Sequence, residues 1–295
     1  MKVLVTGAHG KVGRALVPRL MEVGHELRTC DLTRPVWDRV DPGEAEDYWQ
    51  VDLTDAGAAY AVAAGMDVVV HTAAIPQPIH NAPHVVFANN MLSAFNVLEA
   101  AIAGGARRLV NFSSETVPGF LFALRAFEPE YLPIDEEHPS RPQDAYATSK
   151  WFGELLCERA VERSDIRCTS IRPSWVQDEG SYERNLGPIV RDPSVLIGNY
   201  LGYVDVHDLC EAVVLAIETD LPGHELFYIA SPDTIGGHPL VETANAHYGA
   251  EGIEFRPTTR EDASPVSTSK AERLLGWTPT HTWRDYLDEQ GRSRV

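Results

Sequence analysis

A tyrosine and a lysine four positions apart, Tyr146 and Lys150, lie in a segment whose pattern predicts a helix. Side chains at this spacing stand on one helix face, one turn apart. A nearby ammonium stabilises a phenolate and lowers the pKa of tyrosine from its usual value near ~10 toward neutral pH. Such a tyrosine can take a proton from an alcohol or return it to a carbonyl. The pair therefore predicts acid–base chemistry on a hydroxyl group.

A serine upstream of the tyrosine strengthens this interpretation. Ser114 follows the apolar segment 108–112, which we expect to be a strand. Hydroxyl groups at the carboxyl end of a parallel strand face the crevice in which α/β sheets bind ligands. A Tyr-x-x-x-Lys pair alone also occurs on ordinary surface helices. The order Ser114, Tyr146, Lys150 favours an active site.

The N-terminus carries the pattern of a dinucleotide-binding turn. The strand-like segment 3–5 leads into Thr6-Gly7-Ala8-His9-Gly10-Lys11-Val12-Gly13, which opens onto a helical run. Gly7 can adopt the tight turn, Gly10 lets a pyrophosphate approach, and Gly13 lets the helix pack on the strand. The free amides at the start of the helix attract phosphate charge.

An acidic residue, Asp31, ends the next apolar segment. Its carboxylate can accept both ribose hydroxyls of the adenosine half and would repel a 2′-phosphate, which favours NAD over NADP. Arg34 lies close enough along the chain to weaken that preference. The alternative role of Asp31 is to cap a turn.

Strand and helix patterns alternate along the first part of the chain, which predicts a doubly wound parallel sheet of the Rossmann type, an α/β fold with right-handed crossovers. The expected strands are 3–5, 26–30, 48–53, 68–72, 108–112 and 167–171, and the expected helices are 14–20, 55–64, 83–103 and 145–163.

Beyond Arg172 the pattern loosens, and Pro, Gly and Asn become frequent. We expect one further strand–helix unit at 203–219 and helices near 270–275 and 283–289. The predicted domains are an NAD-binding Rossmann domain at 1–172, joined by 203–219, and a small substrate-binding lobe. That lobe would comprise 173–202 and 220–295.

Composition narrows the class of protein. The chain has 295 residues, 25 basic and 43 acidic, and a formal net charge of −18, which argues against nonspecific binding to nucleic acid or anionic membranes. The four cysteines, Cys30, Cys157, Cys168 and Cys210, form no metal or disulfide pattern. With no leader pattern and no stretch expected to span a bilayer, the sequence predicts a cytoplasmic protein without a metal site.

In these features the chain resembles the extended branch of the short-chain dehydrogenase/reductase superfamily, the NAD-dependent epimerase/dehydratase family. The likeness covers nearly the whole sequence. The matching segments, in order, are Thr6–Gly13, Asp31, Asp52-Leu53, His71-Thr72-Ala73-Ala74, Asn90, Ser113-Ser114-x-x-Val117, Tyr146-x-x-x-Lys150, Ile171-Arg172-Pro173 and Ser269-Lys270-Ala271-x-x-x-Leu275-Gly276-Trp277-x-Pro279.

The resemblance implies that Ser114 binds the reacting oxygen, Tyr146 transfers its proton, and Lys150 orients the nicotinamide ribose and lowers the tyrosine pKa. It also implies a homodimer through the helices 83–103 and 145–163. The cofactor-binding residues that it implies are Gly7, His9, Gly10, Lys11, Val12, Gly13, Asp31, Asp52, Leu53, Thr72, Ala73, Ala74, Asn90, Tyr146, Lys150 and Pro173.

Departures from the family pattern narrow the expected activity. Thr116 stands where the dehydratases carry a second acid, so dehydration is disfavoured. Leu201 stands where nucleotide-sugar epimerases carry a diphosphate-binding arginine, and Pro118 replaces a usual tyrosine. In these respects the chain is similar to the uronate dehydrogenases, which oxidise free sugars.

The predicted function is NAD-dependent hydride transfer to or from a hydroxyl of a sugar or sugar acid. The expected substrate-binding residues are Gln77, Ser114, Glu115 and Trp175, whereas His71 is expected to make a core hydrogen bond. Two alternatives stay open: a nucleotide-sugar epimerase with tightly bound NAD, and a non-catalytic nucleotide-sensing regulator on the same fold. An epimerase and a dehydrogenase share these residues and differ in cofactor release.

Overall fold

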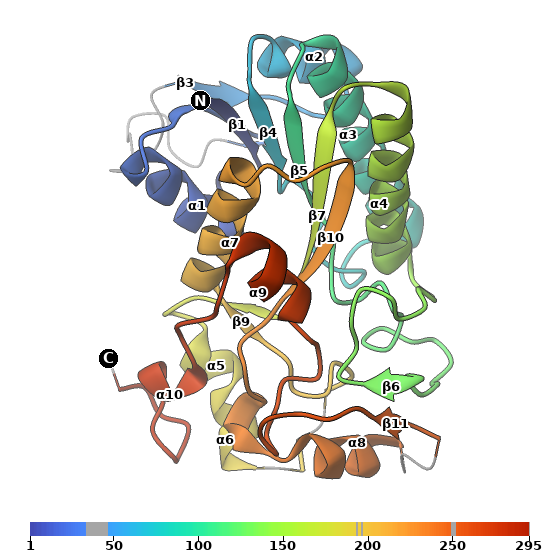
Figure 1. The fold of residues 1–295 in the computed structure, drawn as a ribbon, viewed down its shortest axis with the longest axis vertical. Helices are drawn as coiled ribbons and strands as arrows, with labels where there is room; N and C mark the ends of the chain where they lie inside the picture. The colour runs from blue at the N-terminus through green and yellow to red at the C-terminus, as the bar shows by residue number, and fades with distance from the viewer. Residues whose placement is uncertain (34–46, 193, 196, 249–251, 295) are drawn as a thin grey trace. The chain divides into compact units, whose positions relative to one another are not determined.

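A seven-stranded sheet forms from the apolar segments that the sequence analysis singled out (Figure 1). The strand order is β10-β7-β5-β4-β1-β2-β3, and the pairs β1–β2, β2–β3, β1–β4, β4–β5 and β5–β7 are parallel. The strands are β1 Lys2–Thr6, β2 Glu26–Asp31, β3 Asp47–Gln50, β4 Val68–His71, β5 Arg108–Phe112, β7 Arg167–Pro173 and β10 His224–Ile229. Successive strands are added on one side of β1 up to β3 and on its other side from β4 onward. The strand order therefore reverses between β1 and β4, the position at which Rossmann folds bind dinucleotides.

The computed structural model describes residues 1–33, 47–192, 194–195, 197–248 and 252–294. The chain divides into two compact units, and each is described by itself. The first unit comprises Met1–Ser113, Ala145–Ile171 and Val213–Leu226, and the second Ser114–Asp144, Arg172–Ala212 and Phe227–Val295. This division assigns 114–144 to the second unit, whereas the sequence analysis placed that stretch in the predicted NAD-binding domain.

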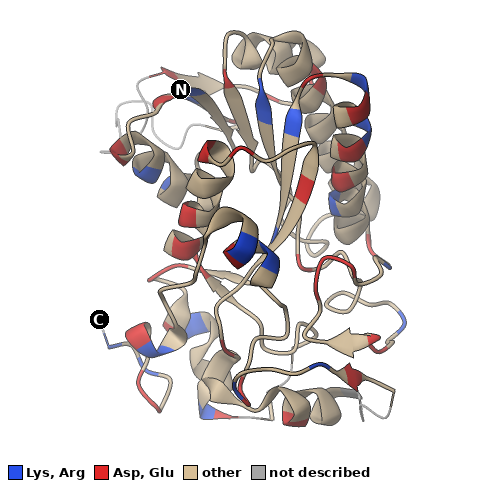
Figure 2. Ribbon diagram, in the orientation of Figure 1, with Lys and Arg blue, Asp and Glu red and all other residues tan. Residues whose placement is uncertain are grey.

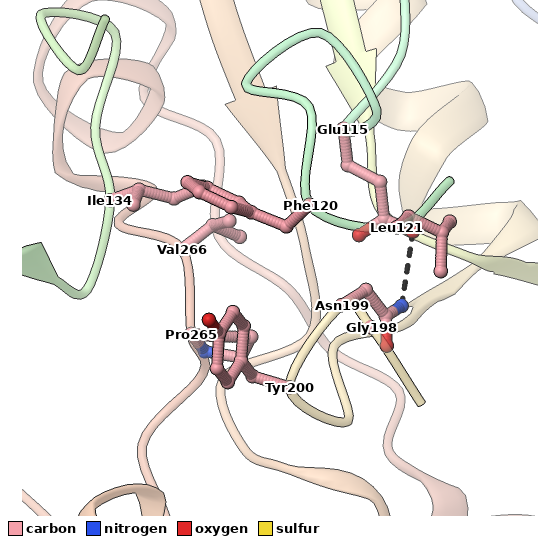
Figure 3. Close-up of a pocket in the computed structure, with 9 residues that line it drawn as sticks. All are labelled: Glu115, Phe120, Leu121, Ile134, Gly198, Asn199, Tyr200, Pro265 and Val266. Carbon is pink, nitrogen blue, oxygen red and sulfur yellow. Dashed lines mark hydrogen bonds between the residues drawn. The ribbon is translucent and has the colours of Figure 1, made fainter. Parts of the chain in front are cut away.

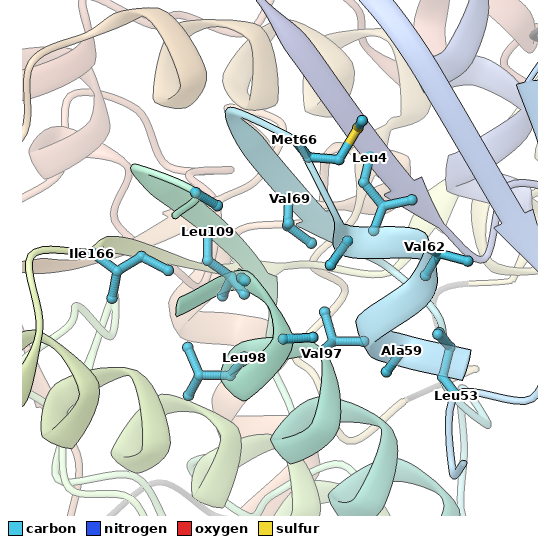
Figure 4. Packing of buried hydrophobic residues seen from close by; sticks show 14 of the residues in the cluster. Leu4, Leu53, Ala59, Val62, Met66, Val69, Val97, Leu98, Leu109 and Ile166 are labelled. Atoms are coloured by element: carbon cyan, nitrogen blue, oxygen red, sulfur yellow. The ribbon is translucent and has the colours of Figure 1, made fainter. Parts of the chain in front are cut away.

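Helices and apolar strands pack into one core in the first unit. The helices are α1 Lys11–Glu22, α2 Ala56–Ala63, α3 Pro83–Ala103, α4 Ala145–Arg163 and the end of α7 Val206–Glu218. Figure 4 shows side chains of β1, β4 and β5, such as Leu4, Val69 and Leu109, meeting Val62 of α2 and Val97 of α3. These side chains are buried, which is the main favourable term in holding helices onto the sheet.

Helix α3 is 21 residues long and apolar enough, by length and composition alone, to cross a membrane, and 44% of that window is buried. The expectation that no stretch reaches that length was therefore wrong. Its buried face packs with α2 and α4 in the first unit. A core helix of this kind passes the same test.

The second unit is built from short elements. Two small parallel sheets pair β6 Tyr131–Leu132 with β11 Glu254–Phe255, and β8 Val176–Gln177 with β9 Val204–Asp205. Its helices are α5 Tyr182–Asn185, α6 Gly187–Arg191, η1 Ile235–Gly237, α8 Leu240–Tyr248, α9 Ser269–Leu275 and α10 Trp283–Tyr286. Acidic residues are spread over the helices and loops of each unit (Figure 2).

Two predictions about the chain beyond residue 200 need correction. The strand expected at the start of 203–219 is β9, which pairs with β8 in a small sheet of the second unit. The strand that extends the main sheet is β10, which the sequence analysis left in a Pro- and Gly-rich tail. All four cysteines are buried thiols, three in the first unit and Cys210 in the second.

Candidate active site

The glycine turn after β1 is closely packed, and its backbone explains why glycine occurs at two positions. Gly7 has a φ of +68°, and a Cβ there would lie 2.7 Å from the backbone nitrogen of Ala73. A Cβ on Gly13 would lie 2.4 Å from the carbonyl oxygen of Gly7. Both approaches are closer than any side chain permits, so the turn can hold α1 against β1 only with glycine.

The N-terminus of α1 fits a pyrophosphate. Gly10 is the N-cap residue, with no side chain to bond the first-turn amides. Unbonded amides at a helix N-terminus, together with the positive end of the helix dipole, attract phosphate oxygens. Gly7, Gly10 and Gly13 therefore fit the phosphate-binding role predicted for them, and Lys11 and Val12 form the first turn.

Asp31 lies beside this turn at the end of β2. Its Oδ2 accepts a hydrogen bond from the backbone N–H of His9 (2.9 Å), and its Oδ1 accepts one from the N–H of Leu32 (2.7 Å). These bonds fix the carboxylate next to the glycine turn, as a ribose-binding acid requires. The His9 ring stacks on Tyr48 at 4.9 Å. Arg34, which the sequence analysis weighed against Asp31, lies outside the described residues.

The loop after β3 carries Asp52 and Leu53, two of the residues that the family resemblance implies for cofactor binding. Asp52 accepts hydrogen bonds from the N–H and the hydroxyl of Thr54 (2.9 and 2.7 Å). The carbonyls of Leu53 and Thr54 accept bonds from the amide of Asn96 on α3, both at 3.0 Å. Asn96, which the sequence analysis did not single out, therefore ties this loop to α3.

The end of β4 is held by amide and hydroxyl side chains. Thr72 Oγ1 donates to the carbonyl of Thr6 (2.6 Å), next to Ala73 and Ala74. The Asn90 amide bonds the N–H and carbonyl of Ile75 (2.8 and 3.1 Å) and donates to the Ser149 hydroxyl (3.2 Å). Asn90 thus links the loop after β4 to α4, the helix that carries Tyr146 and Lys150.

Tyr146 and Lys150 lie on one face of α4, as their spacing predicts. The Lys150 ammonium lies 5.7 Å from the centre of the Tyr146 ring. Lys150 Nζ also donates to the carbonyl of Phe112 (2.7 Å) at the end of β5. One turn further along α4, the buried carboxylate of Glu154 accepts a hydrogen bond from Ser113, the residue after β5. Two successive turns of α4 are therefore tied to the last residues of β5 and its exit.

Burial lowers the pKa of Lys150 to about 8. The cation is therefore retained at neutral pH and is lost as the pH rises through that value. Burial, with a smaller contribution from Lys150, lowers the pKa of His71 to about 3. His71 is thus a neutral ring that hydrogen-bonds Thr6 (2.9 Å), the core role that was expected for it.

Ser114 belongs to the second unit, and its hydroxyl is buried. Its Oγ accepts hydrogen bonds from the N–H and the hydroxyl of Thr116 (3.2 and 3.0 Å). Because those bonds occupy its lone pairs, the Ser114 hydroxyl keeps its proton for a different acceptor. Thr116, noted in the sequence only as a missing acid, orients the serine.

The remaining substrate candidates lie in different surroundings. The carbonyl of Pro173 accepts the N–H of Glu115 (3.2 Å), and the Glu115 carboxyl accepts a bond from Asn199 (3.1 Å). Trp175 packs on an apolar cluster of the second unit that includes Tyr182 and Leu201. Gln77, in the first unit, is exposed in the loop after β4. The structure therefore brings Pro173, Ser114 and Glu115 together within the second unit.

Comparison with known proteins decides the family. Residues 3–230 match the family described as "NAD dependent epimerase/dehydratase family". The chain belongs to that family. Its cofactor is NAD, as the family description states, and it is an NAD-dependent oxidoreductase, with sugar epimerases and dehydrogenases among its relatives. The Rossmann fold and the enzyme class predicted from the sequence are thereby confirmed.

Two curated relatives and one solved structure illustrate the likeness. A UDP-glucose 4-epimerase of Corynebacterium glutamicum is 27% identical over 314 residues, covering 96% of this chain and 92% of the epimerase. A uronate dehydrogenase of Agrobacterium fabrum is 35% identical over 162 residues, covering 55% and 56%. A crystal structure of a UDP-galactose 4-epimerase is 28% identical with a TM-score of 0.68, covering 96% and 94%.

Proposed function

We propose that this chain is an NAD-dependent dehydrogenase that oxidises a hydroxyl group of a free sugar or sugar acid. The observation that carries the proposal is the α4 pair: a half-buried lysine cation lies 5.7 Å from the ring centre of Tyr146 and donates to the carbonyl of Phe112. A positioned cation beside a phenol favours the phenolate, which can act as a base toward an alcohol.

In the proposed reaction each residue has one role. Tyr146 takes the hydroxyl proton of the substrate, and Lys150 stabilises the phenolate and holds the nicotinamide ribose. Ser114 donates a hydrogen bond to the oxygen that becomes a carbonyl, and Thr116 keeps the serine proton pointed outward. When bound, NAD accepts the hydride. Asp31 and the glycine turn bind the adenosine and pyrophosphate parts.

The preference for a free sugar rests on Leu201. At this position nucleotide-sugar epimerases carry an arginine that binds the diphosphate. Leu201 is 1% exposed and belongs to an apolar cluster with Tyr182, Leu186 and Tyr203. An apolar buried side chain offers a phosphate neither charge nor a hydrogen bond. The A. fabrum uronate dehydrogenase is a relative whose name states oxidation of such a sugar.

An epimerase is the second candidate, because the UDP-glucose 4-epimerase of C. glutamicum matches along nearly the whole chain. The deciding experiment incubates the purified protein with NAD and a panel of aldoses, uronates and nucleotide sugars and follows NADH. Net NADH with a free sugar supports the proposal. Tightly bound NAD and epimerisation without NADH release would instead establish the epimerase. The non-catalytic regulator is not favoured, since Ser114, Tyr146 and Lys150 are all retained.

Replacing Asp31 by alanine is expected to narrow the preference for NAD over NADP. The carboxylate fixed by His9 and Leu32 would repel the 2′-phosphate of NADP, and alanine removes that repulsion. Calorimetric titration of wild type and Asp31→Ala with both cofactors measures the change. Equal or tighter binding of NADP by the wild type would show that Asp31 does not select the cofactor, with Arg34 the next residue to test.

We propose that the protein forms a homodimer through α3 and α4. Positions 85, 88, 92 and 95 of α3 form one exposed stripe at helical spacing, with Leu92 49% and Phe95 46% exposed. On α4, Leu155 is also exposed, and Phe152 contacts Phe87 of α3 edge-on at 5.9 Å. Val97 and Leu98 of α3 do not belong to this surface, because both are buried in the core.

This surface predicts a dimer at micromolar concentration in light scattering, since contiguous apolar area on a helix pair favours burial against a second copy. Leu92→Lys combined with Phe95→Lys is expected to give a folded monomer. Tyr60→Lys, at an exposed position of α2, serves as the control and is expected to remain dimeric. A monomeric wild type would remove the proposal.

We also propose that the protein works in the cytoplasm without nucleic-acid or membrane partners. Four buried thiols suit a reducing compartment, and the net charge of −18 opposes binding to polyanions.

A further inference from the structure

A small cavity in the second unit lies beside Glu115, the residue that follows Ser114. The volume open to the centre of a water molecule is about 10 Å³, which is room for one water or one hydroxyl group. Apolar side chains form most of its wall (Figure 3). The lining residues are Glu115, Phe120, Leu121, Ile134, Gly198, Asn199, Tyr200, Pro265 and Val266.

Two polar side chains on this wall point toward one another. The Asn199 Nδ2 donates to Glu115 Oε1 at 3.1 Å and to the carbonyl of Gly202 at 2.8 Å (Figure 3). The oxygen of the same amide, Asn199 Oδ1, is buried and has no hydrogen-bond partner among the described residues. A buried acceptor without a partner costs folding free energy unless a bound molecule donates a hydrogen bond to it.

The backbone around Asn199 is held in an unusual conformation. Tyr200 and Leu201 both have positive φ, 54° and 66°. Non-glycine residues rarely adopt such values, and consecutive ones persist only where packing fixes them. Here both side chains are buried, and a Cβ on Gly198 would lie 3.0 Å from the Cα of Leu121. The loop is thus packed tightly against the segment that follows Ser114.

We propose that Glu115 and Asn199 form a neutral subsite that binds one hydroxyl group of the sugar, with the carboxyl O–H donating and Asn199 Oδ1 accepting. This inference rests on the proposed function and deepens it, because it assigns a specificity-determining pair. A hydroxyl group is both donor and acceptor, so it satisfies both members of the pair. A carboxylate or phosphate would find no cation here.

The surroundings keep the Glu115 carboxyl uncharged. Three neutral groups lie against the Glu115 carboxyl: the Asn199 amide, the Ser174 hydroxyl and the backbone N–H of Trp175. Their hydrogen bonds favour the ionised carboxylate, but burial favours the neutral carboxyl more strongly. Apart from the Tyr200 phenol, no other ionisable side chain lines the cavity in the described part of the chain. Burial accordingly raises the pKa of Glu115 to about 8.

The first test needs no substrate. Between about pH 5 and about pH 8 the native protein retains a proton on Glu115 that the unfolded chain has lost, so this group's contribution to stability falls as the pH rises. Glutamine cannot ionise. The melting temperature of Glu115→Gln should therefore match wild type near pH 5 and exceed it increasingly toward pH 8. A constant difference between the two curves would overturn the neutral carboxyl.

The second test compares the best free sugar from the NADH screen with its monodeoxy analogues, using the protein with NAD. In wild type, one analogue should lose on the order of 10²-fold in kcat/KM, because it leaves the pair unpartnered. In Glu115→Leu and Asn199→Leu, the ratio of kcat/KM for the parent sugar to kcat/KM for that analogue should fall close to one. The reason is that each substitution lowers kcat/KM for the parent sugar selectively. Glu115→Gln keeps a donor and should retain most of the discrimination.

Glu136→Gln is the matched control. Glu136 is also in the second unit, accepts the N–H of Tyr228 at 2.9 Å, has a pKa raised by burial, and does not line the cavity. Its substitution should leave the ratio unchanged. Equal losses for the parent sugar and every analogue in Glu115→Leu would overturn the subsite and leave the proposed dehydrogenase standing. If wild type turns over no sugar at all, the proposed function fails, and the subsite fails with it.

Discussion

Tyr146→Phe is expected to lower turnover on the order of 10²–10⁴-fold, the range assigned to general acid–base catalysis. The phenyl ring still packs in the same place, and only the proton-carrying oxygen is lost. NAD affinity should stay close to the wild-type value, because Lys150 and the glycine turn are unchanged. Steady-state kinetics on an identified sugar and calorimetric titration with NAD measure the two quantities separately.

Tyr60→Phe is the control for this substitution, because Tyr60 is an exposed tyrosine on α2 of the same unit. It should keep full turnover. A folded Tyr146→Phe variant that binds NAD and retains nearly full turnover would contradict the assignment of Tyr146, and with it the interpretation of α4 as the catalytic helix.

Lys150→Met is expected to weaken NAD binding and lower turnover together. The substitution removes the cation beside Tyr146 and the hydrogen bond to the Phe112 carbonyl. Without the cation the phenolate is less stable, so the pH at which activity appears should rise. The pKa of Lys150 is about 8, so wild type itself loses the cation above that pH, and the gap between the two enzymes should narrow there.

Lys150→Arg tests the same residue by conservation of charge, since arginine stays protonated at every pH of interest. It should keep part of the activity and shift the pH at which activity appears less than methionine does. A pH profile that is the same for wild type, Lys150→Met and Lys150→Arg would show that the cation does not act on the tyrosine.

Local sequence patterns predicted the part of the fold that local physics determines. The helices expected at 83–103 and 145–163 have those bounds in the structure, and Pro83 in the first turn and Gly104 at the C-cap mark the two ends of α3. The glycine turn could also be predicted from the sequence. A Cβ at Gly7 or Gly13 would lie less than 3 Å from backbone atoms, so both positions require glycine.

Strand β10 could not be recognised in the same way. It begins with His224 and Glu225 directly after Pro222 and Gly223, so its first residues read as a loop. Its place beside β7 depends on pairing with a strand more than fifty residues earlier in the chain. Such pairing leaves no mark on local periodicity.

The candidate site divides along the same line. Ser114, Tyr146 and Lys150 were visible because their chemistry needs particular residue types at a particular spacing. The residues that hold them, Asn90 and Thr116, were visible only as a family match and a missing acid. The role of Asn199 could not be predicted from the sequence, because it depends on a loop with positive φ at Tyr200 and Leu201. Neither residue is a glycine, the residue type that would indicate such a loop.

Because all four cysteines are buried, the rate at which each reacts with a thiol reagent reports on local unfolding. A thiol reagent reacts with thiolate, and burial both hides Cys30 and raises the pKa of its thiol to about 12, so modification must wait for the surrounding structure to open. Cys30 on β2, Cys157 on α4 and Cys168 on β7 report on the first unit, whereas Cys210 reports on the second. The order in which these four sulfurs become labelled, resolved by mass spectrometry with and without NAD, therefore measures which unit the cofactor keeps closed.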